Sequence, residues 1–241
     1  MIILPAIDLH HGCAVRLLRG DYAQMTEYSD HPEDVAEEFA AAGAEYLHIV
    51  DLEGAKTGEP VNLASVEKII RRSGLKTQLG GGIRSLEIVR NYLDIGVSRV
   101  ILGTAALKDP SFLEAAVASY GAAVAVGVDL QDGKVAVNGW TEISDTDFRG
   151  FCHKMEDLGV QTIICTDISK DGAMQGTNRS LYAELQKEFH RNIVASGGVS
   201  SLADVRALAR SGLYGAILGK ALYTGAIDLK EALRAAEGGG V

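Results

Sequence analysis

The sequence predicts an α/β fold, a (β/α)8 TIM barrel, from three observations. Short apolar segments and helical segments alternate eight times along 241 residues, no composition break divides the chain, and the second half repeats patterns of the first. Strictly alternating β and α elements form parallel sheets, and eight such pairs in this length favour a closed barrel over an open sheet. We expect a single barrel domain over residues 1–241, with half-barrels at about 1–120 and 121–241.

The eight predicted strands share one composition. Each is only a few residues long, is rich in Val, Ile or Leu, and does not alternate in polarity. This pattern is typical of parallel strands that are buried on both faces. In chain order the predicted strands are Ile2–Ile7, Tyr46–Val50, Lys76–Leu79, Arg99–Leu102, Ala122–Val128, Thr162–Cys165, Asn192–Ala195 and Ala216–Leu218.

Helical segments lie between these strands. The first opens with Pro32, Glu33 and Asp34, residue types that helix N-termini prefer, and its Val35 and Phe39 lie four residues apart on one face. Glycines that suit left-handed C-caps follow several of the segments. The other predicted helices cover about 62–72, 85–95, 110–119, 147–158, 180–189, 201–211 and 228–235.

Composition narrows the class of protein. A net charge of −9 without any basic run argues against a nucleic-acid surface, because phosphate backbones require clustered Lys and Arg. Cys13, Cys152 and Cys165 are widely spaced, so neither a disulfide framework nor a zinc site is expected. The chain shows no signal-peptide pattern and no apolar run near the ~20 residues of a membrane span. We expect a cytoplasmic monomer that binds a small molecule, without a metal or cofactor.

An internal repeat carries the functional prediction. Residues 81–86 align with 197–202, and at the same offset residues 101–105 align with 217–221. Glycines recur after predicted strands three, four, seven and eight, at the barrel end where active sites lie. Glycine lets backbone N–H groups approach an anion closely, although such glycines can also serve turn packing alone.

These glycines predict two phosphate-binding cradles and thus a substrate with a phosphate at each end. The first is expected around Gly82, Gly103 and Thr104, and the second around Gly176, Gly198 and Gly219.

Two carboxylates occupy equivalent places in the repeat. Asp8 and Asp129 each follow a wholly apolar strand, on opposite sides of the barrel mouth between the two cradles. Two carboxylates in different surroundings can divide acid and base roles, so both are predicted to be catalytic. Asp51, Asp167 and Asp171 also follow strands and are better candidates for holding or polarising the substrate.

Other candidates lie in the loops at the same end. Trp140, the only tryptophan, lies in a polar loop after strand five and is expected to act as an aromatic lid. His48 on strand two is expected to point into the barrel top and contact the substrate. His10 and His11 follow Asp8 but lack the spacing of metal ligands, so catalysis by them is disfavoured.

Several motifs together resemble one enzyme family, the phosphoribosylformimino-5-aminoimidazole carboxamide ribotide (ProFAR) isomerases of histidine biosynthesis. The resemblance covers essentially the full chain, in order. The motifs that carry it are Pro5-Ala6-Ile7-Asp8-Leu9, Val15-Arg16-Leu17 with Arg19-Gly20-Asp21-Tyr22, His48-Ile49-Val50-Asp51-Leu52, Gly81-Gly82-Ile83-Arg84, Gly139-Trp140, Thr166-Asp167-Ile168-Ser169-Lys170-Asp171-Gly172 and Ser196-Gly197-Gly198-Val199.

The resemblance implies an Amadori rearrangement of an aminoaldose ribotide to an aminoketose, without cofactor or metal. It implies Asp129 as the general acid on the ribose ring oxygen, supported by Thr166, and Asp8 as the general base at C2′. Trp140 would stack over the substrate. Patterns and resemblance together predict a substrate-binding set of Arg19, His48, Gly81, Gly82, Arg84, Gly103, Thr104, Trp140, Thr166, Asp171, Gly176, Gly198 and Gly219.

Three alternatives remain at this stage. The cyclase subunit of imidazole glycerol phosphate synthase shares the two-phosphate symmetry, but the Ala-Ile-Asp start and Trp140 favour the isomerase. A bifunctional isomerase that also accepts phosphoribosyl anthranilate would have Arg where this chain has Asn138. A non-catalytic binder of a phosphorylated metabolite would not need both Asp8 and Asp129.

Overall fold

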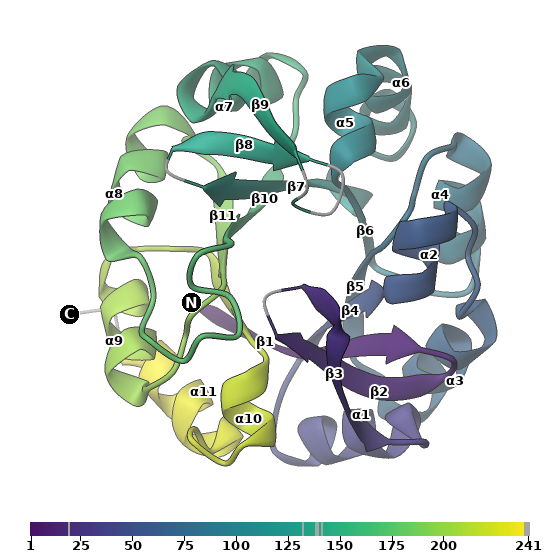
Figure 1. Ribbon diagram of the computed structural model, residues 1–241, viewed down its shortest axis with the longest axis vertical. Helices are drawn as coiled ribbons and strands as arrows, with labels where there is room; N and C mark the ends of the chain where they lie inside the picture. The colour runs from purple at the N-terminus through teal and green to yellow at the C-terminus, as the bar shows by residue number, and fades with distance from the viewer. Residues whose placement is uncertain (19, 132, 138–139, 141, 239–241) are drawn as a thin grey trace.

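Eight parallel strands close into a barrel in the computed structural model, which describes residues 1–18, 20–131, 133–137, 140 and 142–238 (Figure 1). Each strand pairs with the next around the ring, and the last pairs with the first. The predicted α/β barrel is confirmed. Around the ring the strands are β1 (Ile2–His10), β4 (Tyr46–Asp51), β5 (Lys76–Gly80), β6 (Arg99–Leu102), β7 (Val124–Gln131), β10 (Thr162–Asp167), β11 (Asn192–Ser196) and β12 (Gly215–Leu218).

A ring of helices surrounds the strands (Figure 1). Their bounds agree with the predicted segments to within about two residues at most ends, because capping residues mark where they begin: Ser85 and Ser201 each accept a hydrogen bond from the backbone three residues on. The helices that follow the barrel strands are α1 (Pro32–Ala41), α3 (Leu63–Ser73), α4 (Leu86–Asp94), α6 (Pro110–Tyr120), α7 (Phe148–Asp157), α8 (Arg179–Glu188), α9 (Leu202–Arg210) and α11 (Leu229–Glu237).

Several shorter elements were not predicted. Strand β3 is polar and largely exposed, and the helix after β4 has only six residues, so neither carries the apolar period on which the prediction rests. The start of β7 was placed too early, because Gly121–Ala123 form a 3-10 turn (η1) after α6. The additional elements are β2 (Cys13–Leu18), β3 (Asp21–Ser29), α2 (Leu52–Thr57), α5 (Thr104–Lys108), β8 (Lys134–Val137), β9 (Glu142–Asp147) and α10 (Lys220–Tyr223).

The barrel strands bury both of their faces, as their uniformly apolar composition requires. Alternate residues such as Ile3 and Ile7 pack outward against the helices, in a cluster that runs around the barrel. The residues between them point inward and fill the barrel centre. This inner cluster consists of Leu4, Ala6, Ile101, Ala125, Ile164, Val194 and Ile217.

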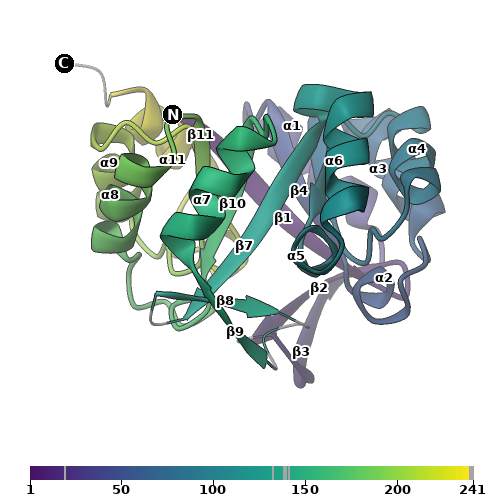
Figure 2. The same cartoon turned by 90° about the horizontal axis from the view of Figure 1, so that it is seen from above.

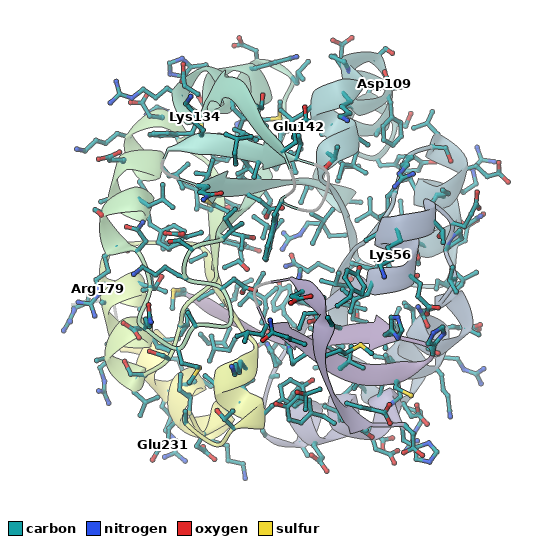
Figure 3. The ribbon with its side chains drawn as sticks, in the orientation of Figure 1. Lys56, Asp109, Lys134, Glu142, Arg179 and Glu231 are labelled. Carbon is teal, nitrogen blue, oxygen red and sulfur yellow. The ribbon has the colours of Figure 1, made fainter. Side chains whose placement is uncertain are left out.

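The two ends of the barrel differ. The hairpins β2–β3 and β8–β9 extend β1 and β7 and project beyond the carboxyl ends of the strands, whereas the start of β1 and the last helix lie at the opposite end (Figure 2). Charged side chains such as Arg179 and Glu231 point outward from the helix ring (Figure 3). Across the described residues, no helix has the length and apolar character to cross a membrane.

Candidate active site

A cavity of about 840 Å³ opens at the carboxyl ends of the barrel strands. Every strand of the ring contributes at least one residue to its wall, so the closed barrel gathers side chains that are far apart in sequence. Barrel enzymes place their active sites at this end. One lining residue from each strand, in order around the ring, is Asp8, His48, Gly80, Ile101, Asp129, Thr166, Ser196 and Ile217.

Asp8 lies on β1 and forms an ion pair with Arg16 of the neighbouring antiparallel strand β2. The Arg16 Nη1 to Asp8 Oδ2 distance is 2.9 Å, and 13% of the Asp8 side chain is exposed. Burial raises the pKa of Asp8, and the Arg16 charge and hydrogen bond offset only part of this effect. Arg16 also donates to the carbonyl oxygen of Ala6, so its guanidinium is fixed beside the carboxylate.

Asp129 lies on β7, the counterpart of β1 in the second half. Its pKa is raised by burial, against the lowering effect of side-chain hydrogen bonds from Trp140 and Thr166. Thr166 is the register partner of Asp129 on β10. Trp140 adopts a left-handed backbone with φ 72°, which few residues other than glycine adopt. The indole therefore reaches the carboxylate from an unusual turn in the loop after β8.

Asp171 is a third carboxyl group in the same cavity wall, in the turn after β10. Burial, and then the negative charges of Asp8 and Asp129, raise its pKa to about 6, with Arg16 acting in the opposite direction. Like charges in one desolvated site disfavour joint ionisation. The cavity can therefore hold a carboxyl proton near neutral pH.

The glycine pairs after β5 and β11 form equivalent turns. Gly81 and Gly82 have φ of 122° and 70°, and Gly197 and Gly198 have φ of 86° and 81°. A Cβ atom on Gly82 would lie 1.7 Å from the carbonyl oxygen of Gly54. The missing Cβ atoms therefore leave room for the backbone of the preceding loop, which packs directly against each pair of glycines.

Gly176 packs against the glycine turn of the second half as Gly54 does in the first. A Cβ atom on Gly198 would lie 2.5 Å from the carbonyl oxygen of Gly176. Gly176 itself is not among the residues of the cavity wall, unlike Gly198 and Gly219. The structure therefore places Gly176 behind the second cradle, where its backbone crowds the glycine turn.

Asp51 and Asp167, considered as substrate-holding groups, serve these loops instead. Asp51 is fully buried and accepts hydrogen bonds from the backbone of Gly54 and from the side chain of Asn62, both at 2.8 Å. Asp167 accepts at 2.6 Å from the side chain of Asn178, which matches Asn62 in the repeat. Neither carboxylate is part of the cavity wall. That expectation is wrong for both residues, because their oxygens are already used to hold the loops.

Gly103 and Gly219 end strands β6 and β12 at the cavity wall. No atom lies within 4 Å of a Cβ position on Gly103, whereas the Arg16 guanidinium carbon lies 3.0 Å from that of Gly219. Lys220, which follows Gly219, donates to the carbonyl oxygen of Gly172 at 3.1 Å. The second glycine therefore has the Arg16 guanidinium beside it, and the first faces open space.

The comparisons with known proteins agree with this geometry. Residues 2–228 match the family described as Histidine biosynthesis protein. The chain belongs to this family. It is 50% identical to a 1-(5-phosphoribosyl)-5-((5-phosphoribosylamino)methylideneamino) imidazole-4-carboxamide isomerase of Listeria welshimeri, over 96% of each chain. The isomerase of the same name from Oceanobacillus iheyensis (49%, over 97% of each chain) and the one named isomerase 2 from Ruegeria sp. (50%, over 99% of this chain and all of the relative) are similarly close.

The predicted site residues of this family member gather in one place. The structure brings to the cavity wall Asp8, His48, Gly81, Gly82, Arg84, Gly103, Thr104, Asp129, Trp140, Thr166, Asp171, Gly198 and Gly219. Arg19 lies outside the described residues, and Gly176 stands behind the wall. His10 and His11 are not in the wall, and His11 pairs with Glu53 at 2.9 Å. Neither side chain therefore belongs to the group of residues that the structure gathers at the cavity.

Sequence reasoning missed Arg16 as a site residue, although Arg16 belongs to the Val15-Arg16-Leu17 motif of the family resemblance. The signal was available, because Arg16 is the single charge within the apolar strand β2 and an isolated buried cation requires a partner. Among the described residues, no group of three or more His, Cys, Asp or Glu side chains is arranged to hold a metal ion.

Proposed function

We propose that this chain is the ProFAR isomerase of histidine biosynthesis, which converts its aminoaldose substrate into the ribulosyl isomer PRFAR by an Amadori rearrangement. The observation that carries the proposal is the placement of Asp8 and Asp129 in one cavity, between two equivalent glycine turns. The names of relatives about 50% identical over nearly the whole chain support the same reaction.

In the first proposed step Asp129 donates its proton to the ribose ring oxygen. The C1′–O4′ bond breaks with its electron pair going to that oxygen, and the lone pair of the glycosylamine nitrogen forms the C=N bond of a Schiff base. Burial, which raises the pKa of Asp129, favours the protonated form that this step needs. Hydrogen bonds from Trp140 and Thr166 then stabilise the carboxylate that remains.

In the second proposed step Asp8 removes the proton at C2′. The electrons of that C–H bond neutralise the Schiff base and leave the enol form of the aminoketose. Arg16 supports this role, because its charge opposes the effect of burial and favours the ionised carboxylate. The proposed acid and base thus differ in their neighbours: Asp129 has neutral donors, and Asp8 has a cation.

Asp171 is a second candidate for the proton donor. Its pKa of about 6 permits a protonated fraction near neutral pH, and it shares the cavity wall with both other carboxyl groups. Single Asn substitutions of Asp129 and Asp171, compared for kcat on one substrate, distinguish the two. The acid should be the residue whose loss has the larger effect on ring opening.

The proposal assigns one substrate phosphate to each glycine cradle. Backbone N–H groups bind anions without side-chain charge, so a net charge of −9 is compatible with a bisphosphate. Gly82, Gly103 and Thr104 would contact the first phosphate, and Gly198 and Gly219 the second. We further propose a monomeric, cytoplasmic enzyme with the whole chain as one domain.

A coupled assay with purified protein and ProFAR tests the function. We expect turnover of ProFAR without added metal, and no turnover of phosphoribosyl anthranilate under the same conditions. Turnover of both compounds would indicate the bifunctional isomerase; Asn138, the residue that bears on this alternative, lies outside the described residues. Binding of ProFAR without any turnover would contradict the isomerase assignment.

A further inference from the structure

A chain of polar side chains crosses the inside of the barrel below the cavity. Gln78 of β5 lies beside His48 of β4, with 3.0 Å between Gln78 Nε2 and His48 Nδ1. Arg99 of β6 donates from Nε and Nη2 to Gln78 Oε1, at 3.2 and 2.6 Å. Its Nη1 lies 3.3 Å from Thr162 Oγ1 on β10. These residues link the base of the barrel to the wall of the cavity.

The direction of these hydrogen bonds determines which ring nitrogen of His48 carries the proton. Arg99 can only donate, so the atom of Gln78 that faces it is the amide oxygen. The amide nitrogen of Gln78 then faces His48, and it too can only donate. His48 Nδ1 must therefore accept, and the ring proton of neutral His48 lies on Nε2. Because Arg99 can only donate, it determines the direction of every hydrogen bond in the series from Arg99 through Gln78 to His48.

The surroundings also keep His48 uncharged. Burial, and then the positive charges of Arg16 and Arg99, lower the pKa of His48 to about 3. The ring lines the cavity that holds Asp8, Asp129 and Asp171. A cationic His48 would favour ionised carboxylates there and would reduce the protonated fraction that an acid needs. The structure gives Nε2 no hydrogen-bond partner among the residues that it describes.

We propose that Gln78 and Arg99 are positioning residues that hold His48 as the neutral Nε2–H tautomer, so that it donates a hydrogen bond to an acceptor atom of the substrate. The tautomer follows from the geometry of the chain itself. Its use in recognition rests on the isomerase function proposed above. An acceptor such as a hydroxyl or carbonyl oxygen fits this donor, whereas an ammonium group would not.

Nitrogen-15 NMR of the ligand-free protein tests the tautomer directly. The protein carries six histidines, so a His48→Gln variant identifies the His48 signals by their loss. We expect a neutral ring with the proton on Nε2 between pH 5.5 and 8, in agreement with the pKa of about 3. A proton on Nδ1, or an imidazolium in this range, would overturn the proposal. The tautomer is read from the parent protein, in which the contacts of Gln78 and Arg99 are intact.

Gln78→Glu tests the control of the tautomer. A carboxylate can pair with Arg99 but can only accept from His48, so the ring proton should move to Nδ1, or the ring should gain a second proton. Thr77→Val is the matched control, because Thr77 is buried on the same strand and its hydroxyl donates to Leu75. Its His48 signals should match those of the parent protein. A parent-like His48 in Gln78→Glu would contradict the proposal.

The kinetic consequence separates positioning from general damage. If the ring proton moves to Nδ1, Gln78→Glu should raise KM for ProFAR by roughly ten- to hundredfold, because His48 Nε2 would then be an acceptor that faces an acceptor of the substrate. If the ring gains a second proton, Nε2 keeps its donor and KM should stay within a fewfold of the parent value. The kcat of Gln78→Glu should fall less, and Thr77→Val should retain both constants. An inactive parent protein with the expected tautomer would refute the proposed function alone. Unchanged KM in a Gln78→Glu variant with a displaced proton would refute the recognition role.

Discussion

The two glycine cradles have the same backbone but different charges around them. In each half a pair of glycines with positive φ packs against the preceding loop, and a further glycine ends the next strand. The space beside Gly103 is open, whereas the Arg16 guanidinium lies against Gly219. The repeat therefore preserves the geometry that presents backbone N–H groups, while the side chains around it have diverged.

The charge at the second cradle comes from the first half of the chain. Arg16 belongs to the hairpin after β1, and β1 lies beside β12 because the barrel is closed. The same guanidinium pairs with Asp8, so the proposed base and the second cradle share one cation. Closure of the ring thus gives one half a group that its own sequence lacks.

The largest expected effect follows from the loss of either of the two equivalent carboxylates. Asp8→Asn and Asp129→Asn should each lower kcat by about 10²–10⁴-fold, the usual contribution of a general acid or base, with small changes in substrate binding. Steady-state kinetics and a binding titration on each variant check this. Near-normal turnover in either variant would contradict the role assigned to that residue.

The next effect tests the charge difference between the cradles. Arg16→Met should lower kcat/KM by roughly ten- to hundredfold, because it removes a buried cation beside both Asp8 and Gly219. Arg71→Met is the matched control: Arg71 is exposed on α3 and lies outside the cavity wall, so its loss should cost less than about twofold. Equal losses in the two variants would show that the effect does not come from the cation beside Asp8 and Gly219.

The raised pKa of Asp171 leads us to expect that replacing this residue stabilises the fold in a pH-dependent way. Its folded-state pKa is about 6 against 3.8 for the free group, so the folded protein binds the proton more tightly and loses stability as pH rises through that window. Asp171→Asn should therefore raise the free energy of unfolding at pH 7.5 by about 1–3 kcal/mol.

Denaturant titrations of parent and variant at two pH values check this prediction. The difference should disappear below about pH 3, which is below both the folded value of about 6 and the free value of 3.8, so that Asp171 is neutral in both folded and unfolded states. A stabilisation that is equally large at low pH would show that charge burial at Asp171 is not its cause.

The smallest effect concerns contact between the two hairpins. A Cβ atom on Gly20 would lie 2.8 Å from the Trp140 ring, whereas Gly133, at the other hairpin turn, has no atom within 4 Å. Both glycines have positive φ, so Gly20→Ala and Gly133→Ala should each destabilise the fold by about 1–2 kcal/mol. Only Gly20→Ala should shift the fluorescence of Trp140 and raise KM severalfold. Identical fluorescence in both variants would exclude the contact in solution.

Sequence periodicity predicted the eight strands and the eight helices because each buries a continuous apolar face. It could not predict β3, whose residues are mostly polar and exposed and whose pairing depends on its neighbour β2. The internal repeat identified Asp8 and Asp129 as equivalent. The repeat also pointed to Asp51 and Asp167. In both halves, however, this carboxylate accepts a hydrogen bond from an Asn side chain of the following loop and does not line the cavity.

The residues that sequence reasoning missed act across strands. Arg16 reaches Asp8 and Gly219 from a neighbouring hairpin, and Arg99 reaches Gln78 from the next strand. No local pattern announces such partners, because their meeting depends on register between strands and on the direction of each side chain. Only the folded ring brings them together.

The separation of the barrel ends also has a practical consequence for how the protein can be handled. The start of β1 lies at the end opposite the hairpins that surround the cavity (Figure 2). A carrier protein or solid support joined at Met1 would therefore stand on the far side from the cavity mouth. Immobilised this way, the protein should present its cavity to the surrounding liquid and bind diffusing molecules as freely as the untethered chain does.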